Sequence, residues 1–262
     1  MTAQTMFGLE EVLATELRKL GARDVEQHNR AVSFVGDIGF MYKANLCLYT
    51  ALRILVPIKT FHVRNEQDLY DEIKNINWET YMGVDDTLAV NCSLNSELFN
   101  HSQFLSQKTK DAIVDQFREK YNKRPSVDLD QPTLRIHLFV SQDTCMISLD
   151  SSGESLHKRG YRDMTNLAPI NEVLAAGIVK LTGWDGFRNF VDPMCGSGTI
   201  LIEAALQALN IPAGYYRKSF GFMRWKNFDE ELWNKILDSA VAKIKEGDRV
   251  IIGSKSFIYQ EE

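Results

Sequence analysis

Cysteine is sparse in this sequence of 262 residues, and the few cysteines are not grouped. Cys47, Cys92, Cys145 and Cys195 form no CxxC pair and have no histidine close by at the spacing of metal ligands. This distribution argues against a disulfide scaffold and gives no indication of a bound metal. Reduced thiols in a cytoplasmic protein fit it best.

A targeting segment and a membrane span are also missing. The N-terminus "MTAQTMFGLEEVLATELRKLG" has no cationic start followed by an apolar run. No stretch approaches the ~18 consecutive apolar residues that a membrane-spanning helix needs. We therefore expect a soluble intracellular protein without a membrane partner.

An excess of positive charge is absent as well, because 30 Lys and Arg stand against 35 Asp and Glu, a net charge of −5. This balance argues against a protein that coats nucleic acid through bulk charge. Two local stretches, residues 155–162 and 217–226, still combine four basic or potentially basic residues with aromatic ones. Such mixtures suit phosphate contact and base stacking, and a solvated surface is the alternative.

The length and the hydrophobic pattern predict more than one domain, at roughly 150 residues each. The first segments alternate between helical and strand periodicity and predict a small α+β layer with a strand edged by Pro57. The predicted elements are a helix at 8–21 ending on Gly21, a strand at 30–37, a helix at 37–51 and a strand at 53–63.

A second α+β unit follows, because the same kind of alternation begins again. Its predicted elements are a helix at 65–82, a strand at 87–94, a helix at 106–122, and strands at 132–143 and 144–152 joined by a turn at Gln142 and Asp143. Residues 152–170 are rich in Gly, Ser and basic side chains without periodicity, which is typical of a connection between domains.

The last third reads as the opening of an α/β domain. Helices are predicted at 170–183, 198–210 and 229–247, and strands at 187–194 and 249–254. A doubly wound sheet normally has about five or six strands, so these two predict an incomplete domain.

The turn between the strand at 187–194 and the helix at 198–210 has the composition of a ligand site. Gly196 and Gly198 can adopt positive φ, and the N-terminus of the next helix attracts a carboxylate or phosphate. Asp192, at the carboxyl end of the strand, could accept hydrogen bonds from a ligand amine or hydroxyl. A tight turn without any ligand is the alternative.

The spacing of the glycines narrows the choice of ligand. A third glycine of the GxGxxG pattern is missing, and so is the GK[ST] of a phosphate-binding loop. A ligand with ammonium, carboxylate and ribose groups is therefore favoured, and S-adenosylmethionine is such a cofactor. Cys195 is expected to make only a backbone contact, since no base or cation adjoins it in the sequence. Glu203 lies in an apolar helix and either reaches the pocket or faces solvent.

Five segments together resemble the THUMP-domain RNA methyltransferases, close to the bacterial 23S ribosomal RNA guanine-N2 methyltransferases. They are "KDAIVDQF" (110–117), "RPSVDLDQP" (124–132), "LDSSGESLHKRGYR" (149–162), "APINEVLAAGIV" (168–179) and "DPMCGSGTILIEAA" (192–205). The resemblance implies mixed α/β and α+β architecture: an N-terminal ferredoxin-like subdomain (1–62), a THUMP domain (63–151), a linker (152–169) and an incomplete Rossmann-like methyltransferase domain (170–262).

The resemblance also implies a set of functional residues. For S-adenosylmethionine these are Asn171, Asp192, Cys195, Gly196, Ser197, Gly198, Thr199 and Glu203. For phosphates of RNA, with 23S ribosomal RNA as the implied partner, these are Lys108, Lys110, Lys158, Arg159 and Arg162. Each of these cations could instead be a solvated surface charge.

Two features of the family pattern are missing from this sequence. Ser254, Lys255 and Ser256 stand where the family has an aspartate for the cofactor ribose, and no Asn or Asp precedes a Pro-Pro-aromatic triplet anywhere. We therefore expect a fragment of a longer enzyme, an artificially shortened chain or a decayed gene.

The sequence leaves two functions open. One is an RNA methyltransferase whose catalytic motif lies outside this chain, and the other is an RNA-binding THUMP protein with a vestigial methyltransferase half. A nicotinamide-dependent enzyme is disfavoured by the glycine spacing and by the absence of an acidic residue after the second strand.

Overall fold

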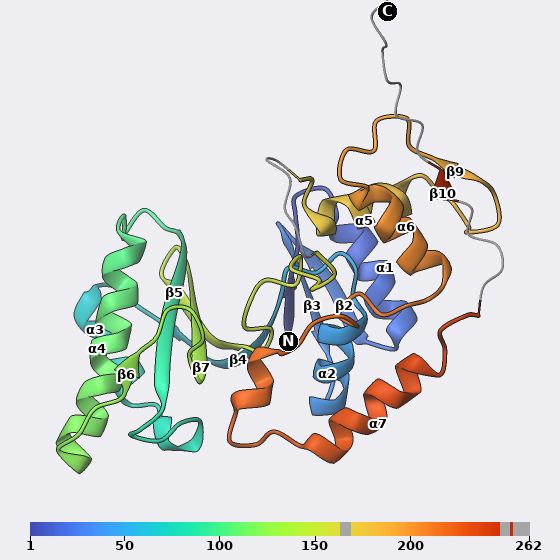
Figure 1. Cartoon of the computed structure of the whole chain (residues 1–262). Coiled ribbons are helices and arrows are strands. Elements are labelled where there is room, and N and C mark those ends of the chain that lie inside the picture. The colour runs from blue at the N-terminus through green and yellow to red at the C-terminus, as the bar shows by residue number, and fades with distance from the viewer. Residues whose placement is uncertain (163–168, 247–251, 254–262) are drawn as a thin grey trace, which may run out of the picture. The chain divides into compact units, whose positions relative to one another are not determined.

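The computed structural model describes residues 1–162, 169–246 and 252–253, drawn in colour in Figure 1. Contacts divide the chain into two compact units. The central unit contains Leu55–Glu154 and Ser219–Phe228, together with Met1. The terminal unit contains Thr2–Ile54, Ser155–Lys218 and the chain from Asp229 onward. The chain passes from the terminal to the central unit within strand β4 (Arg53–His62).

The terminal unit combines an N-terminal sheet layer with helices from the last third of the chain. Its elements are β1 (Thr2–Gln4), α1 (Glu10–Leu20), β2 (Arg23–His28), β3 (Ala31–Val35), α2 (Ile38–Cys47), α5 (Glu172–Leu181), β9 (Phe190–Val191), α6 (Thr199–Ala208), α7 (Glu230–Val241) and β10 (Ile252–Gly253). β3 pairs antiparallel with both β1 and β2, and β10 pairs parallel with β9. The parallel pair confirms the α/β character predicted for the last third.

Helix α1 shows how local sequence sets an element of this unit. Glu10 and Glu11 lie in its first turn and Arg18 and Lys19 in its last, which complements the helix dipole. Gly21 ends it with φ of 100°, a left-handed conformation that suits glycine. The apolar face of α1 is buried at Leu13 and Leu17, as its helical spacing predicts. The predicted helix and its glycine stop are confirmed.

The central unit is a sheet with two helices packed beside each other, as Figure 1 shows. Besides β4, its elements are α3 (Glu66–Lys74), the 3-10 helix η1 (Trp78–Thr80), β5 (Thr87–Asn95), α4 (Ser102–Tyr121), β6 (Ser126–Val127), β7 (Leu134–Ser141), β8 (Thr144–Asp150) and the 3-10 helix η2 (Gly221–Arg224). The strand order is β4-β8-β7-β5-β6, in which β7 is antiparallel to β8 and parallel to β5.

Two irregularities in the central sheet agree with the sequence prediction. The hairpin between β7 and β8 turns at Gln142 and Asp143, where Gln142 has φ of 54°. The pairing of β4 with β8 shifts register between Pro57 and Lys59, because proline has no amide hydrogen to donate to the ladder.

Some elements differ from the prediction. β1 and β6 are only 3 and 2 residues long, and β2 has a largely exposed, polar sequence, so none of them carries a periodic signal. The single helix predicted at 65–82 instead stops at Lys74, and Trp78 turns inward. The indole of Trp78 is fully buried and donates a hydrogen bond to the Ile73 carbonyl at 2.9 Å. Burial of this large side chain outweighs continuation of the helix.

The aromatic stretch at 217–226 also differs from a solvated surface. Phe220, Phe222 and Trp225 are buried, and the first two rings stack at 5.4 Å between centroids. Arg224 donates from Nε to the Pro132 carbonyl at 2.8 Å within the same unit. These rings contribute to the core of the central unit, which excludes their use for base stacking.

Candidate functional site

The glycine turn between β9 and α6 is held by hydrogen bonds among its own residues. Asp192 accepts a hydrogen bond at Oδ1 from the Met194 amide at 3.0 Å, and the Cys195 carbonyl accepts one from the Gly198 amide at 2.7 Å. Gly196 and Gly198 have φ of 52° and 73°. Both values lie in the left-handed region that glycine adopts without steric cost, so the local sequence explains the turn.

Open space adjoins both glycines of the turn. A Cβ atom built at Gly196 or Gly198 would meet no other atom within 4 Å, so these glycines are not required for close packing. Gly198 is the N-cap of α6 and offers no side chain to the first amides of the helix. Uncapped amides at the positive end of a helix suit an anionic group.

The hydroxyls of the turn form a short chain that leads into the protein. Ser197 Oγ lies 3.1 Å from Thr199 Oγ1, and Thr199 is buried. Arg162 Nη2 donates to Thr199 Oγ1 at 2.6 Å. The sequence did not predict this contact, because Arg162 and Thr199 are separated by 37 positions.

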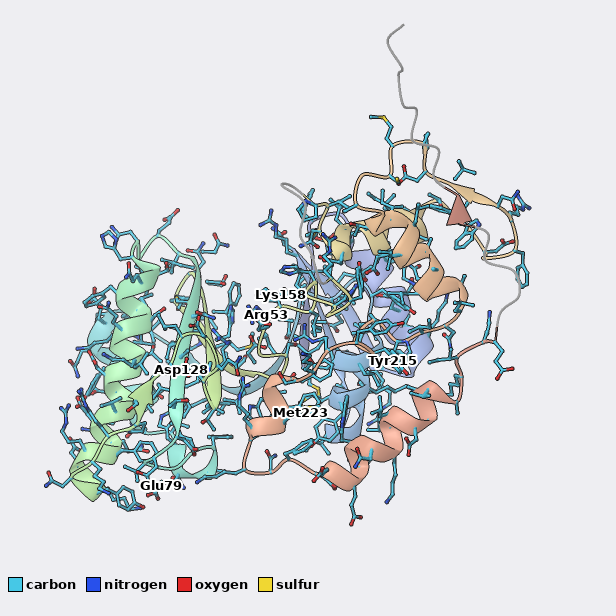
Figure 2. All side chains as sticks on the ribbon, in the orientation of Figure 1. Arg53, Glu79, Asp128, Lys158, Tyr215 and Met223 are labelled. Carbon is cyan, nitrogen blue, oxygen red and sulfur yellow. The ribbon has the colours of Figure 1, made fainter. Side chains whose placement is uncertain are left out.

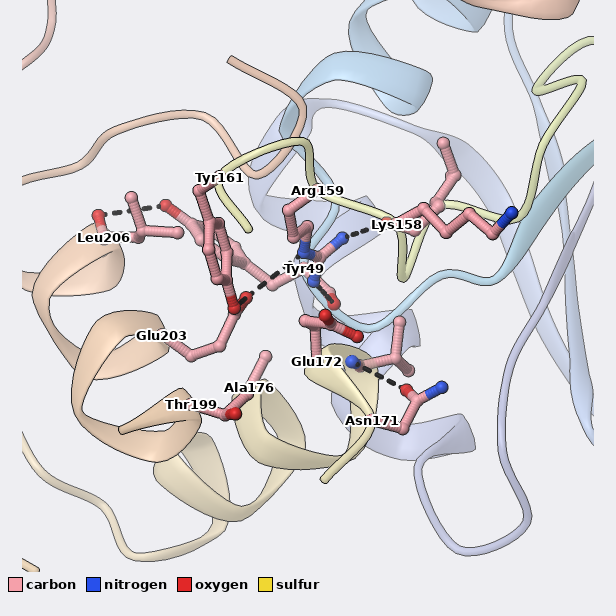
Figure 3. Close-up of polar contacts among 12 residues, drawn as sticks. Tyr49, Lys158, Arg159, Tyr161, Asn171, Glu172, Ala176, Thr199, Glu203 and Leu206 are labelled. Atoms are coloured by element: carbon pink, nitrogen blue, oxygen red, sulfur yellow. Dashed lines mark hydrogen bonds and ion pairs between the residues drawn. The ribbon is translucent and has the colours of Figure 1, made fainter. Parts of the chain in front are cut away.

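Glu203 faces the interior and not solvent, and its expected contact with the cofactor stays a prediction. Its side chain is 0% exposed, and Oε1 accepts from Arg159 Nε at 3.3 Å and from the Tyr161 hydroxyl at 3.1 Å (Figure 3). Among the described residues, Oε2 has no hydrogen-bond partner. Burial raises the pKa of Glu203 above its ordinary value, although the Arg159 guanidinium opposes this.

Arg159 is buried in the same cluster, at 2% exposure. Its Nη1 donates to the Leu156 carbonyl at 2.8 Å, and its Nη2 donates to the Tyr49 carbonyl. With its Nε directed at Glu203, the guanidinium is occupied on every side within the protein. This burial does not fit the phosphate contact expected for Arg159, because an RNA backbone cannot reach an enclosed side chain.

Arg162 is directed at protein partners as well. Its Nε forms an ion pair with Glu172 Oε1 at 2.8 Å, and its Nη2 donates to the Ile170 carbonyl at 3.2 Å. Glu172 is buried and begins α5. Arg162 therefore links the start of α5 to the start of α6, a role that fits its environment better than contact with RNA.

Asn171 has a structural role that its position explains. It is the N-cap of α5, and its Oδ1 accepts from the Val173 amide at 2.9 Å and the Leu174 amide at 3.4 Å. Its expected place beside the cofactor stays a prediction. The residues that stand where the ribose aspartate was sought, 254–256, lie outside the described residues.

Lys158 differs from its two arginine neighbours. It is exposed, and its side chain extends away from the cluster around Glu203 (Figure 3; the residue is also labelled in Figure 2). It remains a candidate for contact with a phosphate.

Lys108 and Lys110 lie on α4 in the central unit, beside a groove. Lys108 Nζ is 4.9 Å from the centre of the Tyr70 ring, and Lys110 Nζ is 2.7 Å from Asp111 Oδ1. Arg118 and Arg124 line the same groove, and the sequence analysis missed them as functional candidates. The helical spacing of Lys110 and Arg118, eight positions apart, could have indicated a shared face.

Cys47, Cys92, Cys145 and Cys195 are all free thiols. Within residues 1–162, 169–246 and 252–253, no group of three or more His, Cys, Asp or Glu side chains is arranged to hold a metal ion. No helix in that part of the chain is both long enough and apolar enough to span a bilayer.

Together, the two units and the glycine turn at the start of α6 define an α/β protein with an open turn suited to an anionic ligand. Comparison with known families assigns three consecutive regions. Residues 1–55 match the RlmL ferredoxin-like domain, residues 63–150 match the THUMP domain, and residues 159–256 match the RMKL-like methyltransferase domain. The chain therefore belongs to the THUMP-domain RNA methyltransferase family, as the resemblance predicted.

Individual relatives agree with this assignment. A protein of Synechocystis sp. named "putative RNA methyltransferase" is 43% identical over 235 residues, which cover 90% of this chain and 61% of the relative. The crystal structure of a "possible methylase" from Clostridium difficile 630 has a TM-score of 0.85 and 31% identity, over 97% of this chain and 67% of that one.

A third relative, a "putative methyltransferase" crystallised in complex with SAH, has a TM-score of 0.84 and 30% identity over 98% of this chain and 68% of that one. This chain thus spans about two thirds of the length of the relatives it matches.

Proposed function

We propose that this chain binds S-adenosylmethionine and RNA as part of an RNA methyltransferase. The observation that carries the proposal is the open glycine turn at the start of α6. The same helix is held in place by the buried Arg159 and the partly buried Arg162. The relative crystallised with SAH supports the same choice of cofactor.

The residues of the turn suit the amino-acid end of this cofactor. The uncapped amides at the start of α6 and the Ser197 hydroxyl would hold its carboxylate. Asp192 uses Oδ1 for the Met194 amide, so its Oδ2 would accept from an ammonium or hydroxyl group of the cofactor. When bound, S-adenosylmethionine supplies a methyl group on a positively charged sulfur.

The contribution of this chain to methyl transfer is binding and orientation. An RNA amine is a weak nucleophile, so the rate depends on how well the two reactants are aligned, and a misplacement of about 1 Å can cost ~100-fold. A turn that is closed by internal hydrogen bonds keeps one conformation, and it would therefore hold the cofactor in one orientation. The same turn on a mobile segment would lose this advantage.

The RNA-binding part of the proposal rests on exposed or half-exposed cations. Lys108 and Lys110 border the groove beside α4, together with Arg118 and Arg124, and Lys158 lies on the linker. These side chains would contact phosphates, which position an RNA without reading its sequence. We assign Arg159 and Arg162 to the support of α6 instead. We propose 23S ribosomal RNA as the substrate and guanine N2 as the methylated atom on the basis of the resemblance to the family.

Calorimetry with S-adenosylmethionine and SAH tests the cofactor site. We expect saturable binding by the unmodified chain, and a loss of at least tenfold in affinity for Asp192→Ala. Asp238→Ala is the matched control, because Asp238 is an exposed aspartate on α7 in the same unit. A folded chain that binds neither compound at millimolar concentration contradicts the proposal and favours an RNA-binding protein with a vestigial methyltransferase half.

The salt dependence of binding tests the RNA site. For a 23S ribosomal RNA fragment, changing Lys108, Lys110 and Lys158 to alanine should flatten the slope of log K against log salt concentration by about 0.7 to 0.9 per phosphate contact. The control carries Lys19→Ala, Lys235→Ala and Lys243→Ala, which removes the same charge from exposed sites elsewhere. If both triple variants change the slope equally, these three lysines form no specific site.

The modified base is tested in cells. Ribosomal RNA from cells with and without the complete gene is digested to nucleosides and analysed by mass spectrometry. We expect the loss of N2-methylguanosine from 23S RNA when the gene is deleted. An unchanged content of that nucleoside excludes the assignment to guanine N2.

A further inference from the structure

One face of α6 is tied to the linker by two side chains a single helical turn apart. Thr199 and Glu203 are separated by four positions, so both project from the same side of the helix. Arg162 contacts the first, and Arg159 and Tyr161 contact the second. The residues 159–162 therefore fit against α6 along a full turn.

This segment is held in place independently of α6. Arg159 donates to the carbonyls of Leu156 and Tyr49. Gly160 has φ of 89°, and a Cβ there would collide with the Tyr216 backbone carbonyl. The backbone of the linker is thus held at Arg159 and packed closely against Tyr216 at Gly160, two positions before Arg162.

The two hydroxyls beyond Arg162 can continue its hydrogen bond outward, from Thr199 to Ser197. The guanidinium has only donors, so Thr199 Oγ1 must accept from Arg162 Nη2. The Thr199 proton is then free to point to Ser197 Oγ, which lies 3.1 Å away. In this arrangement Ser197 Oγ accepts from Thr199, and the Ser197 proton points toward the open space beside the turn. Because Thr199 is 1% exposed, water does not compete for this proton.

We propose that Arg162 is a positioning residue that, through Thr199, makes the Ser197 hydroxyl a hydrogen-bond donor toward the carboxylate of a ligand bound at the glycine turn. The proposal rests on the proposed binding of S-adenosylmethionine. A charged donor at the start of a series of hydrogen bonds strengthens each following hydrogen bond, because it polarises the hydroxyl group that accepts from it. Exposed Ser197 then presents a pre-oriented proton at the edge of the open space beside Gly196 and Gly198.

Two ligands that differ only at the amino-acid end separate this role from general support of the fold. SAH has the carboxylate, and 5′-methylthioadenosine lacks the whole amino-acid end. We expect Arg162→Gln, Thr199→Val and Ser197→Ala each to weaken SAH binding about three- to tenfold, the range of one net hydrogen bond in a protein, and to leave the binding of 5′-methylthioadenosine unchanged. Arg162→Lys should restore part of the SAH affinity. Arg23→Gln, an exposed arginine of β2 in the same unit, is the control.

Because the hydrogen bonds run from Arg162 through Thr199 to Ser197, the losses of SAH affinity should not add. Arg162→Gln combined with Ser197→Ala should weaken SAH no more than Ser197→Ala alone, because the arginine acts through that hydroxyl. Additive losses, or an equal loss of 5′-methylthioadenosine, overturn the proposal and leave Arg162 with a structural role only.

Hydrogen exchange tests the inference without any ligand. In the free chain, Arg162→Gln and Thr199→Val should speed amide exchange at residues 196–199 at least threefold, while α7 is unchanged. If the unmodified chain binds neither compound, the proposed cofactor site is wrong, and this measurement still decides the role of Arg162. Unchanged exchange at 196–199 in both variants overturns that role.

Discussion

Arg159 and Glu203 form an ion pair in the interior of the terminal unit, with 3.3 Å between Arg159 Nε and Glu203 Oε1. Their side chains are 1% and 0% exposed. The two residues are 44 positions apart in the sequence. The pair therefore joins the linker to the helix that follows the glycine turn. Removing both charges from water is costly, and this cost offsets much of the stabilisation that the pair gives.

Breaking this pair should be far more damaging than replacing it. Arg159→Met leaves the Glu203 carboxylate buried and unpaired, and we expect a loss of about 3–5 kcal/mol in the free energy of unfolding. Arg159→Met with Glu203→Leu should recover most of that loss. Urea unfolding measures both, and a double variant as unstable as the single one would contradict this account.

Glu203 should also make stability depend on pH. Burial raises the pKa of Glu203 above 4.5, so the folded chain holds this proton more tightly than the unfolded chain. Between pH 4.5 and the raised pKa, its contribution to the free energy of unfolding therefore falls as pH rises. Glu203→Gln does not titrate, and it keeps an acceptor for Tyr161.

The measurement compares unfolding of the two chains from pH 4.5 upward. We expect the stability of the unmodified chain relative to Glu203→Gln to decrease with pH over that interval. A difference that stays constant or increases with pH shows that Glu203 is ionised in the folded chain throughout.

Gly221 in the central unit should not tolerate a side chain. A Cβ there would lie 2.7 Å from the Gly153 amide nitrogen and 2.9 Å from the Asp150 carbonyl oxygen, and backbone atoms cannot move aside easily. We expect Gly221→Ala to reduce the free energy of unfolding by about 1–3 kcal/mol or more. Gly83→Ala is the matched control in the same unit, because its Cβ would come no closer than 3.4 Å to another atom. Thermal unfolding of the two variants compares them, and equal stabilities would refute the steric explanation.

Substitutions of Gly198 should affect the free energy of unfolding and the affinity for SAH to different extents. Its φ of 73° makes an alanine strained by about 1–2 kcal/mol, although no atom stands in the way. Asparagine adopts this conformation more readily, so Gly198→Asn should unfold closer to the unmodified chain. Both side chains occupy the open space of the turn, and we expect both variants to lose SAH affinity in calorimetry. Retention of affinity by the stable asparagine variant would show that the ligand does not approach this glycine.

The glycine turn and the elements around it were largely predictable. Glycines with positive φ, the N-cap at Asn171 and the dipole charges of α1 depend on neighbours within a few positions, and such interactions can be read along the chain. The resemblance to the family was equally readable, because it rests on consecutive residues. Helix ends were less accurate where burial intervened, as at Trp78.

The roles of the linker arginines were not predictable in the same way. A sequence shows that Arg159 and Arg162 are charged, and charge alone suggested phosphates. It does not show that Glu203 and Thr199, about 40 positions later, take up those guanidinium groups. The same limit applied to Phe220 and Phe222, whose rings looked available for stacking and are buried.

The sequence by itself determined the family, the mixed α/β and α+β class and the position of the glycine turn, since local spacing and consecutive motifs carry that information. The tertiary structure alone decided which charged side chains are enclosed. Burial removes water from a charge and obliges it to find a partner, and that partner is chosen by the folded arrangement of distant segments. For this reason Arg159 and Arg162 support α6, while the neighbouring Lys158 is exposed.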